Sequence, residues 1–307
     1  MGVTEDEITE WFAGQRKLST TDYPIGIGND MAEIQLAEDV SVLITTDMLL
    51  DGVHFDLRQT TLKQVGYKAM AVSLSDCAAM ATVPIGAVVS VALPKGFGEE
   101  QLKQLHGGIV LAGDKFACPL VGGDITCWKG KEPFAVNVAM LSRTAGNAPV
   151  KRSGAKVGDA ICVTGDLGGA VSSKHLNFEP RVKEAIKIAQ MVTLNAMIDL
   201  SDGLSSDLNR ICRASGVGAI INAGRIPISD EAKRGADSLS SALNDGEDFE
   251  LLFTLSPQDC QKLLSKWKGP LPITQIGTIT DTKKMQIAMP DGRLHDLQAQ
   301  GYDHFKR

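Results

Sequence analysis

Aspartates recur in this chain at one kind of position, the end of an apolar run beside glycine or hydroxyl residues. They are Asp30 in GIGNDMA, Asp47 in ITTDM, Asp124 in LVGGDIT, and Asp199 and Asp202 in MIDLSDGL. Each alone has an ordinary explanation, because Asp beside Gly is common in turns and Asp202 could cap a helix that starts near Gly203. Together they form a set of carboxylates, and the sequence contains no cluster of Lys and Arg that could neutralise them. Oxygen ligands of this kind suit hard divalent cations such as Mg²⁺.

Asp76 is a further carboxylate, within a helix that the sequence predicts over 62–81. It falls in the stripe formed by Leu62, Val65, Ala69, Val72 and Met80. An ionised carboxylate against a core costs several kcal/mol unless donors or a cation compensate it. Either the end of the helix emerges into solvent, or Ser73 or a backbone amide hydrogen-bonds to Asp76, or Asp76 joins the other acids at a cation.

Composition and missing motifs exclude several classes of protein. The chain has 307 residues, 43% hydrophobic and 22% charged, and its net charge of −6 without Lys/Arg clusters argues against binding nucleic acid. It contains no GxxxxGK[ST] loop, no HRD or DFG kinase motif, no HExxH and no GxSxG. The five histidines include no metal-binding pair, and we expect four of them at the surface. Bound metal ions therefore remain the main means of stabilising charge that the sequence indicates.

The N-terminal sequence and the cysteines indicate a cytoplasmic protein. The start, MGVTEDE, is acidic, and no apolar run approaches the roughly 18 residues of a membrane span, so we expect neither a signal peptide nor a membrane helix. The six cysteines form no CxxC pair and mostly have apolar neighbours. This favours reduced thiols in a core over disulfides or a zinc site.

Alternating strand and helix patterns predict an α/β protein. Strands are expected over 40–45, 85–93, 134–141, 160–165, 217–222, 249–255 and 273–279, and helices over 62–81, 99–113, 181–195, 203–215 and 257–267. The polar segment 147–160 contains Gly and Pro and shows neither the helical nor the strand periodicity of apolar residues. It predicts two domains, 1–148 and 149–307.

Nine blocks, in order from Gly26 to Phe305, resemble the thiamine-monophosphate kinases. The blocks are GIGNDMA, TTDMLLDGVHF, SLSDCAAMATVP, VGGDIT, RSGAKVGD, VTGDLGGA, IDLSDGLSSDL, GEDFELLFT and GYDHF. That family belongs to the superfamily of aminoimidazole ribonucleotide synthetase, selenophosphate synthetase and the hydrogenase maturation protein HypE. The resemblance implies a two-domain α/β (α+β) fold in a homodimer. The N-terminal strands would form an intersubunit barrel, followed by a C-terminal α/β domain.

The resemblance also implies roles for individual residues. As Mg²⁺ ligands it implies Asp30, Thr45, Thr46, Asp47, Asp76, Asp124, Asp199 and Asp202. Thr46, Asp124, Arg152 and Ser201 would contact ATP, and His54, Glu247 and Tyr302 would line the site for thiamine monophosphate. The residues expected to carry catalysis are Asp47, Asp76, Asp124 and Arg152. The chain departs from the family pattern at Asn29, Ile125, Asp245 and Phe249.

The implied reaction moves the γ-phosphoryl group of ATP to thiamine monophosphate. The acceptor phosphate has a second pKa of about 6 and is mostly a dianion at neutral pH, so no general base is required. Alternatives are an ATP-dependent synthetase or maturation enzyme of the same superfamily, a paralogous kinase for another small molecule, and a nucleotide sensor without turnover. A membrane or nucleic-acid partner is not expected.

Overall fold

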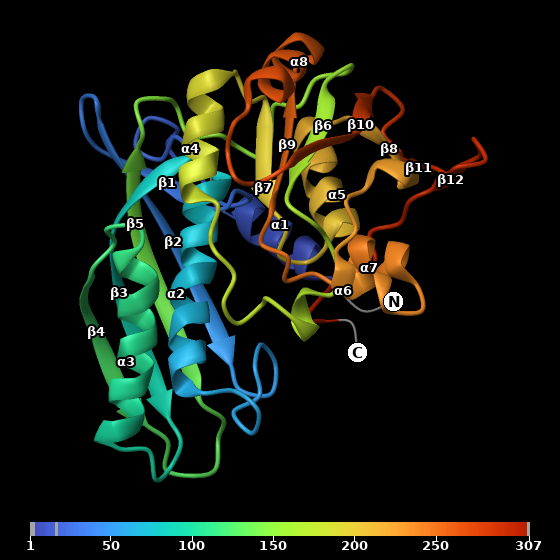
Figure 1. Ribbon diagram of the computed structural model, residues 1–307. Helices are drawn as coiled ribbons and strands as arrows, with labels where there is room; N and C mark the ends of the chain where they lie inside the picture. The colour runs from blue at the N-terminus through green and yellow to red at the C-terminus, as the bar shows by residue number, and fades with distance from the viewer. Residues whose placement is uncertain (1–3, 16–17, 306–307) are drawn as a thin grey trace.

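A five-stranded sheet forms the first half of the molecule. The computed structural model describes residues 4–15 and 18–305 (Figure 1). The strand order is β1-β2-β5-β3-β4, with β3 parallel to β4 and the other neighbours antiparallel. Its elements are β1 (Ala32–Ala37), β2 (Val40–Leu50), α2 (Leu62–Ala79), β3 (Thr82–Leu93), α3 (Glu99–Asp114), β4 (Leu120–Cys127) and β5 (Ala135–Thr144).

A seven-stranded sheet forms the second half, in the order β12-β11-β8-β10-β6-β9-β7. Its strands are β6 (Ala160–Thr164), β7 (Ala196–Asp199), β8 (Gly218–Asn222), β9 (Leu251–Leu255), β10 (Ile273–Thr280), β11 (Met285–Ala288) and β12 (Leu294–Asp296). The helices are α1 (Glu5–Gln15), α4 (Val182–Met191), α5 (Leu204–Ser215), α6 (Asp230–Lys233), α7 (Ser238–Asn244) and α8 (Pro257–Lys266), with short 3-10 turns at Ala170–Ser172 and Ala223–Arg225. No helix within 4–15 and 18–305 has the length and apolar character needed to span a membrane.

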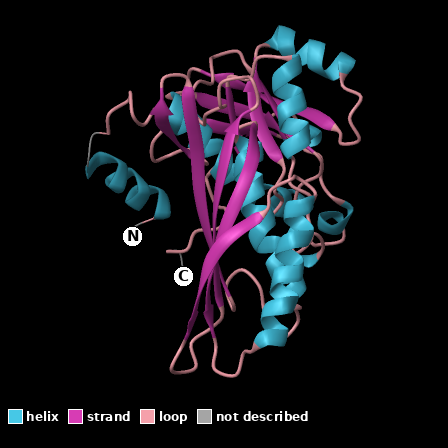
Figure 2. Ribbon diagram, turned by 90° about the vertical axis from the view of Figure 1, so that its left-hand side faces the viewer, coloured by secondary structure: helices cyan, strands magenta, loops and turns pink. Residues whose placement is uncertain are grey.

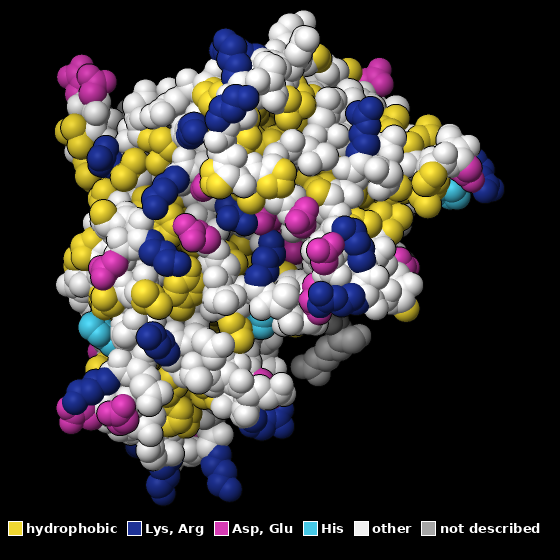
Figure 3. Space-filling model, viewed as in Figure 1, with side chains coloured by type: hydrophobic (Ala, Val, Ile, Leu, Met, Phe, Trp, Pro, Cys, Tyr) yellow, Lys and Arg dark blue, Asp and Glu magenta, His cyan; other side chains and the backbone are white. Residues whose placement is uncertain are grey.

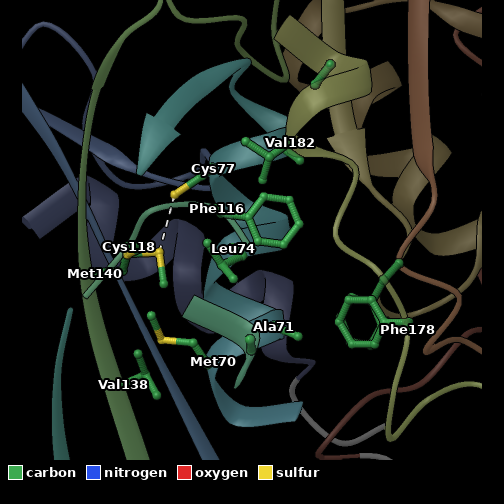
Figure 4. Packing of buried hydrophobic residues seen from close by; sticks show 14 of the residues in the cluster. Met70, Ala71, Leu74, Cys77, Phe116, Cys118, Val138, Met140, Phe178 and Val182 are labelled. Atoms are coloured by element: carbon green, nitrogen blue, oxygen red, sulfur yellow. Dashed lines mark hydrogen bonds between the residues drawn. The ribbon is translucent and has the colours of Figure 1, made fainter. Parts of the chain in front are cut away.

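Helix α2 is the most buried helix of the first half and lies against both halves. Its start is fixed by a capping box, in which Thr61 accepts from the Gln64 amide and the Gln64 side chain accepts from the Thr61 amide. Figure 4 shows Met70 and Leu74 of α2 among the buried side chains, with Met140 of β5 and Val182 of α4 nearby. The Tyr67 hydroxyl donates to the Phe178 carbonyl at 3.0 Å. The two halves therefore share one core.

The opposite face of the first sheet is not covered by helices. In Figure 2 the helices of the first half lie to the right of the long strands, and no helix lies against the lower part of the strands on their left. Apolar side chains on this uncovered face are exposed, among them Met48 at 59% and Val88 at 41%. On the face seen in Figure 3, by contrast, Lys and Arg are interspersed with Asp and Glu. The five strands form an open sheet within this chain, so the intersubunit barrel stays a prediction.

Every predicted strand and helix is present, with shifted ends. Strand 40–45, for example, extends to Leu50, and helix 181–195 ends at Met191. The elements that were not predicted are the strands β1, β4, β7, β11 and β12 and the helices α1, α6 and α7. β4 contains two glycines and is largely exposed, and β7 has only four residues. Neither therefore carries a recognisable apolar period.

The contact between α2 and α3 generates a test of the fold. A Cβ at Gly108 would lie 1.9 Å from the Lys63 carbonyl oxygen, whereas a Cβ at the neighbouring Gly107 would have no atom within 4 Å. We expect Gly108→Ala to lower the free energy of unfolding by about 2 kcal/mol or more, because backbone would have to move. Gly107→Ala is the matched control, and it should stabilise α3 by roughly 0.5 kcal/mol through helix propensity. Urea denaturation measures both, and equal effects would contradict the close packing.

Candidate functional site

A cavity of about 1300 Å³ lies between β2, α2 and loops of the second half; we call it the central cavity. Strand β1 pairs with β2 only as far as Ile44. Beyond that point the edge of β2 is free, and residues from both of its faces reach the cavity. The cavity is lined by all the site residues expected from the sequence except Asp124: Asp30, Thr45, Thr46, Asp47, His54, Asp76, Arg152, Asp199, Ser201, Asp202, Glu247 and Tyr302.

Asp30, Asp76 and Asp199 meet at one wall of the central cavity. Each offers an oxygen, and these oxygens lie within 4.8 Å of one another. Asp30 precedes β1, Asp76 lies near the end of α2, and Asp199 ends β7. We call the three, with the neighbouring Asp47, the acidic cluster. Elements from both halves are therefore needed to build it.

Hydroxyl groups partly compensate the buried charge of the acidic cluster. Ser73 donates to Asp47 at 2.6 Å and Ser75 donates to Asp199 at 2.6 Å, both from α2. Thr45 on β2 donates to Asp76. Alternation along β2 turns Thr45 and Asp47 toward α2, since their neighbours Leu43 and Leu49 are buried there. The C-terminal end of α2 is buried at Ala79 and Met80, so the alternative in which this end emerges into solvent was wrong.

Burial and mutual repulsion raise the pKa values of Asp47, Asp76 and Asp199 in the acidic cluster. Burial, with repulsion from Asp30, raises the pKa of Asp199 to about 7. Burial raises the pKa of Asp47 to about 6, although the Ser73 hydroxyl opposes the change. Burial and the charges of Asp47 and Asp199 raise the pKa of Asp76 well above its ordinary value. Buried oxygen donors at this spacing, with unfavourable charge, fit a hard divalent cation such as Mg²⁺.

Arg152 joins the segment between the two sheets to the acidic cluster. Its guanidinium donates to Asp30 at 2.7 Å, and its backbone amide donates to the Asn29 side chain at 3.2 Å. The Arg152 side chain is 22% exposed and lines the central cavity, so Arg152 is not a solvated linker residue. Asn29 faces Arg152 rather than supplying another negative charge.

Asp202 lies beside the acidic cluster and is paired with an arginine. Its carboxylate is 2.5 Å from Arg210, which also binds Asp207 at 2.7 Å and Asp6 of α1 at 3.0 Å. Asp202 does not cap α5, because the N-cap is Gly203; the carboxylate of Asp207, within the first turns of α5, accepts from the amides of Asp202 and Gly203. Asp202 is therefore held by Arg210 at the rim of the cavity.

Aromatic rings form the other end of the central cavity. The rings of His54 and His304 have centroids 5.4 Å apart, and Tyr302 meets His304 edge to face at 4.9 Å. The Leu50 amide donates to Nδ1 of His54 at 3.0 Å. Burial and the nearby charge of Lys68 lower the pKa of His54, which favours the neutral ring with its proton on Nε2. A flat heterocycle fits between such groups.

Lys68, His175 and His304 are cavity residues that the sequence analysis missed. His175 and His304 belong to the histidines expected at the surface, yet His175 has only 15% of its side chain exposed, and both line the cavity. Lys68 is 1% exposed. It stands three residues after Val65 and four before Val72, inside the same apolar stripe that drew attention to Asp76. The interruption of that stripe by a lysine was the signal that could have found it.

Asp124 lies apart from the acidic cluster within this chain. The sheet order places β5 and β3 between β2 and β4. The register pairs Asp124 with Ser90, Ser90 with Asn137, and Asn137 with Met48. Asp124 therefore shares the uncovered face with Met48, whereas Asp47 points to the other face. Within the described residues of this one chain, Asp124 therefore does not join the acidic cluster.

Two family models cover most of the chain. The AIR synthase related protein, N-terminal domain matches residues 28–144, and the AIR synthase related protein, C-terminal domain matches residues 156–289.

Individual proteins are similar over nearly the whole length. The thiamine-monophosphate kinase of Rhodopirellula baltica is 37% identical over 88% of this chain and 91% of its own length. That of Buchnera aphidicola subsp. Schizaphis graminum is 33% identical over 99% of this chain and 100% of its own. The solved structure of AaThiL complexed with AMPPCP and TMP superposes with a TM-score of 0.84, at 28% identity over 98% of this chain and 97% of the other. This chain therefore belongs to the thiamine-monophosphate kinase family, among the AIR synthase related proteins.

Proposed function

We infer that this protein is a thiamine-monophosphate kinase that uses ATP. It transfers the γ-phosphoryl group of ATP to the phosphate of thiamine monophosphate and produces ADP and thiamine diphosphate. The single observation that carries this inference is the central cavity, which joins a buried acidic cluster at one end to an aromatic wall at the other. The similarity to thiamine-monophosphate kinases, and to AaThiL in complex with AMPPCP and TMP, supports the same reaction.

We propose that Mg²⁺ ions are held by Asp30, Thr45, Thr46, Asp47, Asp76, Asp124, Asp199 and Asp202, with Asp47, Asp76, Asp124 and Arg152 contributing most to catalysis. Bound Mg²⁺ would reduce the repulsion between the two phosphate-bearing substrates and stabilise charge on the transferred group. The oxygens of Asp30, Asp76 and Asp199 lie close enough together to share one ion. Asp47 and Thr45 adjoin them through the same face of β2.

Arg152, Thr46, Asp124 and Ser201 are proposed to contact ATP. Nε and Nη2 of Arg152 donate to Asp30, and Arg152 lines the central cavity, so its Nη1 group is proposed to donate to phosphate oxygens. A planar guanidinium suits two phosphate oxygens at once. Ser201 lies beside Asp202 at the cavity wall. Catalysis then depends on position and charge stabilisation rather than on a general base.

His54, Glu247 and Tyr302 are proposed to bind thiamine monophosphate. Tyr302 offers a ring face to the pyrimidine or thiazolium, and a cation over such a face gains about 0.5–2 kcal/mol. Glu247 is a carboxylate on the wall that the two histidines and Tyr302 form. The organic end of the substrate would lie there, with its phosphate directed at the acidic cluster.

We propose a homodimer that buries the uncovered face of the first sheet, with the N-terminal strands forming a barrel between two copies. The exposed apolar residues on that face support this, since patches of this kind mark interaction sites. The same arrangement gives Asp124 a place at a composite site that one chain cannot build.

We also propose domains 1–148 and 149–307, each with one sheet, and a cytoplasmic location, which suits ATP use and the free cysteines of the described residues.

Asp76→Asn tests the role of the acidic cluster in the reaction. The substitution keeps the size of the side chain and its acceptor for Thr45 but removes a charge from the proposed metal site. We expect thiamine diphosphate formation to fall by about 100-fold or more with an unchanged circular dichroism spectrum. Chromatography should show ADP and thiamine diphosphate in equal amounts from the wild type. ATP hydrolysis to free phosphate without thiamine diphosphate would overturn the proposed kinase reaction.

The raised pKa of Asp199 predicts how metal-free stability depends on pH. The folded state binds this proton more tightly than the unfolded state does, so its stabilising effect is complete below the unfolded pKa near 4 and is lost as pH rises through about 7. In EDTA, Asp199→Asn should therefore match the wild type at about pH 4 and below and be the more stable protein at about pH 8. Mg²⁺ should stabilise the wild type more than the variant at the higher pH. Melting curves measure this, and a destabilised variant at the higher pH would contradict it.

Val88→Glu tests the proposed dimer. A carboxylate on the uncovered face would be buried without a partner in the dimer, so we expect monomers in analytical ultracentrifugation. Val157→Glu is the matched control, because Val157 is also exposed, at 60%, but lies in a turn outside the first sheet. It should leave the wild-type mass unchanged. A monomeric wild type would rule out the dimer.

A further inference from the structure

Lys68 is a buried cation whose donors are all used at the end of the cavity away from the acidic cluster. Its Nζ donates to the His54 carbonyl at 2.7 Å, lies 3.2 Å from Nδ1 of His175, and binds Oε2 of Glu247. An ammonium has three N–H donors and no acceptor. The three N–H groups of Lys68 therefore face three acceptors. This assigns Nδ1 of His175 as an acceptor, with the His175 proton on Nε2.

These contacts connect the two halves across the cavity wall. Lys68 belongs to α2 and His54 to the turn after β2, whereas His175 and Glu247 belong to the second half. Glu247 has φ 61°, a conformation that costs a non-glycine residue energy and persists only when its surroundings enforce it. The Glu247 amide donates to the Ser201 carbonyl at 2.7 Å, and its side chain is held by Lys68. The backbone and the side chain of Glu247 are therefore both fixed.

One carboxylate oxygen of Glu247 remains for a ligand. Lys68 donates to Oε2 of Glu247, and Nδ1 of His175 lies 3.3 Å from the same oxygen, whereas Oε1 accepts from no protein group within residues 4–15 and 18–305. Glu247 is 23% exposed and lines the central cavity. Lys68 thus occupies one oxygen and leaves the other facing the pocket. The charge of Lys68 also keeps that carboxylate ionised, so that it can accept from an N–H group or face a cationic ring.

We propose that Lys68 is a positioning residue that orients Glu247 and the His54 turn for the nitrogen-rich heterocycle of the substrate. It acts through those two residues and touches neither the phosphates nor the acidic cluster. It therefore sets affinity for the organic part of the acceptor and leaves the phosphoryl-transfer step unchanged. This inference rests on the proposed kinase function, because thiamine monophosphate carries both an aminopyrimidine and a cationic thiazolium.

A double-mutant cycle with Lys68→Met and Glu247→Gln tests the proposal. Methionine fills similar volume without charge or donors. We expect Lys68→Met to raise KM for thiamine monophosphate by about 10-fold or more while kcat and KM for ATP stay near wild type, a pattern typical of lost ground-state binding. Glu247→Gln should do the same. The double variant should resemble Glu247→Gln alone, because residues that act through one another are not additive.

Two comparisons separate positioning from a general effect on folding. Lys115→Met is the matched control, since Lys115 donates to Tyr67 at 3.0 Å, beside α2 but outside the central cavity, and it should leave both KM values unchanged. If Lys68→Met fails to fold because Glu247 is left unpaired, the double variant removes both charges and should fold, again with the KM of Glu247→Gln. Additive effects in the cycle, or a Lys68→Met enzyme with wild-type KM for thiamine monophosphate, would overturn the proposal. A wild type that forms no thiamine diphosphate would instead overturn the proposed function.

Discussion

Repulsion among buried carboxylates is the constraint on which the rest of this structure depends. Asp30, Asp76 and Asp199 bring oxygens within 4.8 Å of one another, and the first and last are almost wholly buried. In a medium less polar than water, such charges repel strongly and lose their hydration. The protein compensates this repulsion and lost hydration only in part. The compensating groups are the hydroxyls of Ser73, Ser75 and Thr45 and the guanidinium of Arg152. The proposed divalent cation would complete the compensation.

The fold maintains this unfavourable cluster by placing it where two sheets share one core. Helix α2 carries Ser73, Ser75 and Asp76 on a segment whose apolar residues are buried against β5 and α4. The close approach of α2 and α3 at Gly66 and Gly108 fixes that helix in turn. The stability of the shared core therefore offsets the electrostatic cost of the site. The same helix carries Lys68, so one rigid element positions both the proposed metal site and the proposed acceptor site.

The sequence predicted the regular parts of the fold and most of the site because both leave local patterns. Apolar periodicity located β2 and α2, and aspartates at the ends of apolar runs identified Asp30, Asp47 and Asp199 as cavity residues. Asp124 carries the same local pattern, but strand order and side-chain alternation place it on the other face of the sheet. No local pattern contains that information. His175 and Lys68 are partners only through contacts between the two halves, which a single sequence does not display.

The most direct test of the central claim is anomalous diffraction from crystals grown with Mn²⁺ in place of Mg²⁺ and with AMPPCP. The account predicts an anomalous peak bounded by the carboxylates of Asp30, Asp76 and Asp199, at distances typical of oxygen ligands. A crystal with bound nucleotide and well-ordered carboxylates, but with no anomalous peak among them, would contradict the claim that these acids exist to hold a divalent cation.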